Sequence, residues 1–192
     1  MKRISLAVSA LALVALTASV SSAQSAKAVS LGISAGAAIP VSDFGDVYST
    51  GYNGTVSLSF NSVGTPLGIR IDGMYNSFTD RDDLLIDRPN YRIMSANANL
   101  VYALPGTGIR PYLIGGAGIY NQKAGDSDDS EDDPFDKSPT NFGLNGGIGA
   151  AFPLSGFTTF IEARYHYIFS KEGATDFPVR TAFVPITFGI TF

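Results

Sequence analysis

The sequence predicts an all-β protein, an eight-stranded antiparallel up-and-down transmembrane β-barrel preceded by a cleaved signal peptide. Three observations lead to this prediction. Apolar residues alternate with small or polar ones along eight segments, short and long connections alternate between those segments, and only 16 % of the residues are charged. Soluble domains usually carry about 25 % charged residues. Low charge combined with dispersed apolar residues is typical of strands whose apolar face meets lipid.

The N-terminus has the layout of an export signal. Lys2 and Arg3 form a short basic region, residues 4–20 are apolar or small, and Ser21-Ser22-Ala23 offers a cleavage site. We therefore expect a signal peptide over 1–23 and a barrel domain over 24–192. Cleavage leaves 11 basic residues against 17 acidic ones, a net charge of −6, and no basic footprint for nucleic acid. The chain contains no cysteine, which excludes a disulfide scaffold and cysteine-based sites.

Period-two alternation marks the expected strands, because successive side chains of a strand point to opposite faces. The segments are 29–39, 52–60, 67–76, 95–104, 110–120, 141–152, 161–169 and 184–192. The pattern of 110–120 is the weakest, and we place Leu113, Ala117 and Ile119 on its apolar face. Pro185 removes one hydrogen-bond donor from the last strand, so we expect a local bulge there.

The connections fix the expected topology. They alternate strictly between short and long: 61–66, 105–108 and 153–157 are short, whereas 41–50, 79–90, 122–139 and 170–180 are long. Membrane barrels have short periplasmic turns and long extracellular loops. Both termini are therefore expected on the periplasmic side.

Aromatic residues of the apolar phase fall near both ends of the predicted strands, as interfacial girdles do. They are Phe60, Tyr102, Phe152 and Phe192 at one end, and Tyr52, Tyr75, Phe142, Tyr167 and Phe169 at the other.

Periodicity alone leaves the orientation of the two faces open, because a soluble lipocalin-type barrel also has eight strands. Its outer face would carry many lysines and glutamates, whereas the polar phase here is mostly Gly, Ser, Asn and Thr. Its few charges form the sets Arg70 with Asp72 and Glu162 with Arg164. Such compact pairs suit the narrow interior of an eight-stranded barrel. We therefore expect the apolar face to meet lipid.

The predicted polar network of the lumen contains Arg70, Asp72, Glu162, Arg164 and His166. It would either gate a narrow pore or consist of charges that satisfy one another inside a filled barrel. We favour the second interpretation, because buried charges need partners. Whether the strands that carry these charges approach each other across the lumen is left open.

The third long connection is acidic, with Asp126, Asp128, Asp129, Glu131, Asp132, Asp133 and Asp136. Its spacing is not that of a calcium-binding EF-hand loop. We expect a solvated surface loop and no metal site.

Three strands and the C-terminus carry a family resemblance. The segments Leu67-Gly-Ile-Arg-Ile-Asp72, Pro111-Tyr-Leu-Ile-Gly-Gly-Ala-Gly118 and Phe160-Ile-Glu-Ala-Arg-Tyr-His166 resemble strands of OmpA/OmpX-like outer-membrane β-barrel domains. The end Phe183-Val-Pro-Ile-Thr-Phe-Gly-Ile-Thr-Phe192 resembles the assembly signal of such barrels, which would make Phe192 its last recognised residue. The resemblance implies a place in the bacterial outer membrane. It also implies contact with outer-membrane lipid and lipopolysaccharide, with the barrel-assembly machinery during biogenesis, and with a surface ligand.

Three functions are compatible with this reading. The first is a structural or surface-interaction role, with four extracellular loops on the barrel. The second is a small passive channel, which the narrow interior of eight-stranded barrels disfavours. The third is a lipid-modifying enzyme with His166 as general base, but Ser170 is the nearest downstream serine and no close nucleophile–base pair is visible. We expect the first role, without enzymatic activity and without a cofactor.

Overall fold

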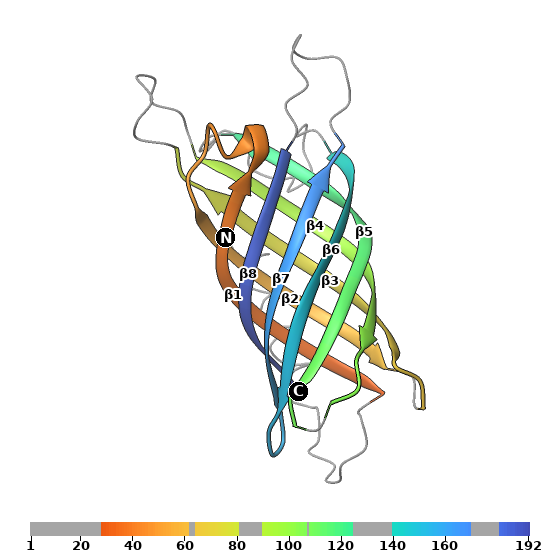
Figure 1. The fold of residues 1–192 in the computed structure, drawn as a ribbon. Helices are drawn as coiled ribbons and strands as arrows, with labels where there is room; N and C mark the ends of the chain where they lie inside the picture. The colour runs from red at the N-terminus through yellow and green to blue at the C-terminus, as the bar shows by residue number, and fades with distance from the viewer. Residues whose placement is uncertain (1–27, 62–63, 81–89, 107, 125–139, 170–180) are drawn as a thin grey trace, which may run out of the picture.

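A computed structural model describes residues 28–61, 64–80, 90–106, 108–124, 140–169 and 181–192. Eight strands follow one another as a closed barrel, in which each pairs antiparallel with its sequence neighbours and β8 returns to β1 (Figure 1). The strands are β1 (Val29–Val41), β2 (Gly51–Asn61), β3 (Leu67–Phe78), β4 (Tyr91–Ala103), β5 (Arg110–Ala124), β6 (Thr140–Pro153), β7 (Thr158–Ile168) and β8 (Thr181–Thr191). The predicted fold class is confirmed.

We call the strand ends joined by 62–66, 104–109 and 154–157 the inner end, and the opposite ends the outer end; the inner end is the lower one in Figure 1. At the outer end, a short 3-10 helix, η1 (Ser42–Phe44), follows β1. Among the described residues, no helix has the length and apolar character to cross a bilayer. The expected signal peptide over 1–23 lies outside the described residues.

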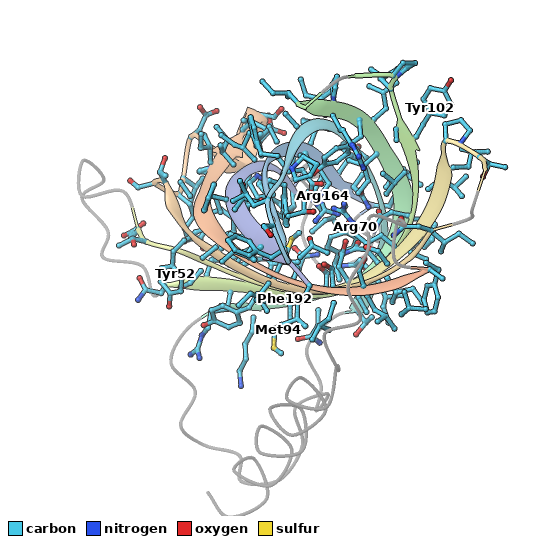
Figure 2. All side chains as sticks on the ribbon, turned by 90° about the horizontal axis from the view of Figure 1, so that it is seen from below. Tyr52, Arg70, Met94, Tyr102, Arg164 and Phe192 are labelled. Atoms are coloured by element: carbon cyan, nitrogen blue, oxygen red, sulfur yellow. The ribbon has the colours of Figure 1, made fainter. Side chains whose placement is uncertain are left out.

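The two faces of the strands point as predicted. Large apolar side chains of the predicted apolar phase are exposed on the outside of the barrel, with Phe188 59 % and Ile148 64 % accessible. On β5, Leu113 and Ile119 also point outward. Figure 2 views the barrel along its axis and shows Arg70 and Arg164 inside the ring, with Tyr52, Met94 and Tyr102 outside it. The soluble, apolar-inside alternative is therefore excluded.

Two local predictions need correction. β4 begins at Tyr91 and not at 95. Over its first few residues Ile93 points inward and Arg92 outward, so the polarity pattern is inverted there and hides the start of the strand. At Pro185 the expected bulge does not form. His166 pairs with Phe183 and Ala163 with Ile186, so the register is the same on both sides of the proline. The pairing of Pro185 with Ala38 of β1 is continuous, because the missing donor faces β7.

The apolar core lies inside the outer end of the barrel. We call it the outer cluster, and it consists of Ala38, Phe44, Met74, Phe78, Ile93, Tyr120, Ile168 and Phe183. Phe44 is its one member from a connection, because η1 carries this side chain to within 5.0 Å of the Phe78 ring, between ring centroids. Ser42, with φ of 56°, lies in the left-handed region where η1 begins, and this turn folds the chain back over the barrel.

Candidate functional site in the barrel lumen

The predicted lumen residues all point inward and are buried or nearly so. Arg70 and Asp72 come from β3, and Glu162 and Arg164 come from β7. These strands lie on opposite sides of the barrel, yet the four side chains meet across the lumen. We call them the charge network. Its two arginines and two carboxylates balance, so the network is neutral as a unit.

The pairing within the network differs from the one the sequence suggested. Arg70 Nη1 lies 2.6 Å from Glu162 Oε2, and Arg164 Nη1 lies 3.0 Å from Asp72 Oδ2. Arg164 Nε also lies 2.8 Å from Glu162 Oε1. The expected pair of Glu162 with Arg164 is therefore present, whereas Arg70 pairs with Glu162 and not with its strand neighbour Asp72. Arg164 joins the two carboxylates, which makes one connected unit of the four charges.

Polar residues that sequence reasoning did not single out complete the network. Asn97 and Asn99 of β4 donate to the two carboxylate oxygens of Asp72, at 3.1 and 2.9 Å. The Tyr112 hydroxyl donates to Glu162 Oε2 at 2.7 Å. The only signal for the asparagines was their position on the polar phase of β4. Both carboxylates thus accept several hydrogen bonds, which is what a buried charge requires.

Glycines on β5 and β6 make room for these side chains. A Cβ atom on Gly118 would overlap the Asn97 amide, and one on Gly149 would overlap the Tyr112 ring. Arg70 fills the remaining space, with its Cζ atom 5.4 Å from the Tyr112 ring centroid and 5.7 Å from that of Phe160. The charge network is therefore tightly surrounded by ring and amide groups, and the glycines of β5 and β6 are part of its construction.

His166 lies between the charge network and the outer cluster. It is fully buried, its Nδ1 lies 2.9 Å from the Tyr120 hydroxyl, and its ring stacks on Phe183 at 4.9 Å between centroids. Within the described residues, its Nε2 has no hydrogen-bond partner. Ser170, the serine of the enzymatic alternative, lies outside the described residues. His166 is thus not a salt-bridged member of the network, although it faces the same lumen.

The remaining predicted site residues divide into two sets. The acidic residues 126–136 lie outside the described residues. Phe192 is half-exposed at the end of the chain, and its backbone N–H donates to Leu31 O at 2.8 Å, which continues the pairing of β8 with β1. The role of Phe192 as an assembly signal stays a prediction.

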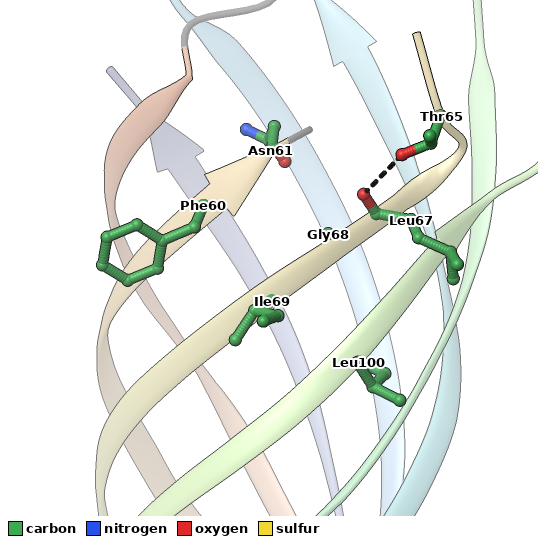
Figure 3. A pocket seen from close by; sticks show the side chains of 7 residues that line it. All are labelled: Phe60, Asn61, Thr65, Leu67, Gly68, Ile69 and Leu100. Atoms are coloured by element: carbon green, nitrogen blue, oxygen red, sulfur yellow. Dashed lines mark hydrogen bonds between the residues drawn. The ribbon is translucent and has the colours of Figure 1, made fainter. Parts of the chain in front are cut away.

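A groove of about 400 Å³ lies on the outside of the barrel near its inner end (Figure 3). Its walls are the outward-facing Phe60, Leu67, Ile69 and Leu100, and the Thr65 hydroxyl donates to Leu67 O at 3.4 Å beside them. Asn61 and Gly68 complete the lining, so none of the lining residues is ionisable. The groove offers an apolar contact surface but no ionisable acid or base.

Several solved structures resemble this chain in fold at low sequence identity. The crystal structure of Neisserial surface protein A is similar with a TM-score of 0.61 and 15 % identity, covering 88 % of this chain and 98 % of that one. A major outer membrane protein from Thermus thermophilus is similar with a TM-score of 0.51 and 16 % identity, covering 86 % and 98 %. The outer membrane enzyme PagL has a TM-score of 0.49 and 17 % identity, covering 83 % and 97 %.

No curated protein sequence matches the chain. The family model described as outer membrane protein beta-barrel domain matches residues 8–192, which include every described strand. A match over this length settles both the family and the cellular location. The chain belongs to the outer membrane protein β-barrel domain family and is a protein of the bacterial outer membrane.

Proposed function

We propose that the barrel is a sealed scaffold that holds surface-exposed loops in the outer membrane, and that it neither conducts solutes nor catalyses a reaction. The observation that carries the proposal is that the lumen is filled at two levels. The charge network occupies the inner half, with Asp72 2 % and Glu162 3 % exposed. The outer cluster occupies the outer half, where Phe78, Ile93 and Phe183 are fully buried.

The outer seal supports this function against the channel alternative. Phe44 comes from a connection and can in principle move, but Phe78, Ile93 and Phe183 belong to the strands themselves. Displacing η1 would therefore leave three large side chains across the lumen. Opening a pore at this level would therefore require several buried side chains to leave their packing inside the closed barrel at once.

The environment of His166 supports the absence of catalysis. A lipid substrate lies outside the barrel, whereas His166 lies inside it, fully buried against Tyr120 and Phe183. A general base must come within hydrogen-bond reach of the proton that it removes. The side chain of His166 points inward, so it offers no such contact to a lipid in the membrane.

Planar-bilayer recordings test the sealed lumen. We expect no conductance steps from the wild-type chain, and none from Phe44→Ala, because the strand residues of the outer cluster stay in place. Wild-type steps that Arg70→Ala or Glu162→Ala alters would overturn the proposal in favour of a channel. Anomalous gel migration of unheated samples controls for folding in each variant.

Surface display is tested by epitope insertion in living cells. A tag inserted in the acidic segment 126–136 should bind antibody on intact cells, since long connections of such barrels are extracellular. The same tag inserted in the short connection 154–157 should bind antibody only after the outer membrane is opened. The reverse labelling would contradict the proposed topology.

A further inference from the structure

No further inference is drawn: the strongest candidate, the apolar groove that Phe60, Leu67, Ile69 and Leu100 line on the outside of β2–β4 near the inner end, is part of the outward apolar face of the barrel, and nothing in the described part of the chain shows what covers it.

Discussion

The two halves of the lumen are filled by different chemistry on the same inward phase of the strands. The inner half holds the charge network, in which salt bridges of 2.6 and 3.0 Å join β3 to β7. The outer half holds the outer cluster, in which rings such as Phe78 and Phe183 pack at 5.6 Å between centroids. Inward orientation therefore does not imply polarity. In the inner half the inward side chains pair their charges, and in the outer half they pack their rings against one another.

Disrupting the charge network of the inner half should lower the unfolding free energy most. Glu162→Ala removes the partner of Arg70, Arg164 and Tyr112 and leaves an uncompensated buried charge, so we expect a loss of about 3–5 kcal/mol in unfolding free energy. Urea unfolding of the barrel in lipid vesicles measures it.

The double variant Glu162→Ala/Arg70→Ala is the control for this charge argument. It restores neutrality, because Arg164 and Asp72 remain paired at 3.0 Å. Its loss should therefore be smaller than that of Glu162→Ala alone. A loss in the double variant equal to the sum of the two single losses would contradict a network that acts as one neutral unit.

Disrupting the outer cluster should lower the unfolding free energy nearly as much, for a different reason. Phe183→Ala removes a fully buried ring that contacts both Phe78 and His166, and the cavity should cost about 3 kcal/mol. Phe188→Ala, on the same strand but 59 % exposed on the outside, should cost less because lipid fills the space. Equal losses for the two variants in the same urea titration would contradict the cluster as a packed core.

Much of this architecture could be predicted from the sequence, because period two fixes the face of each residue independently of tertiary contacts. The predicted strands and the inward direction of Arg70, Asp72, Glu162, Arg164 and His166 follow from that rule. The link from Arg70 to Glu162 could not be predicted, since it depends on the stagger of strands that lie on opposite sides of a closed barrel.

The outer cluster was missed for another reason. Phe78 and Phe183 lie just beyond the predicted ends of their strands, where the polarity of the two phases changes. Ile93 lies near the start of β4, between the predicted connection 79–90 and the predicted strand 95–104. Phe44 lies in a connection, where no periodic signal exists. An extension of each strand by a few residues on the same phase would have placed Phe78, Ile93 and Phe183 inside.

The smallest predicted effect concerns how η1 joins the outer cluster. Ser42 has φ of 56°, which glycine adopts without strain and β-branched residues adopt poorly. Ser42→Gly should leave the unfolding free energy nearly unchanged, whereas Ser42→Val should lower it by about 1–2 kcal/mol. Thermal unfolding by circular dichroism measures both. A valine variant as stable as the wild type would show that the turn does not hold Phe44 in place.

The opposite directions of Phe183 and Phe188 allow the most direct test of the whole account. The chain has no native tryptophan, so Phe183→Trp and Phe188→Trp each give one fluorophore on β8. In vesicles with brominated acyl chains, which quench on contact, the fluorescence of Trp at position 188 should fall strongly and that at position 183 should change little. Strong quenching at position 183 with little at position 188 would contradict an apolar face turned to lipid around a filled lumen.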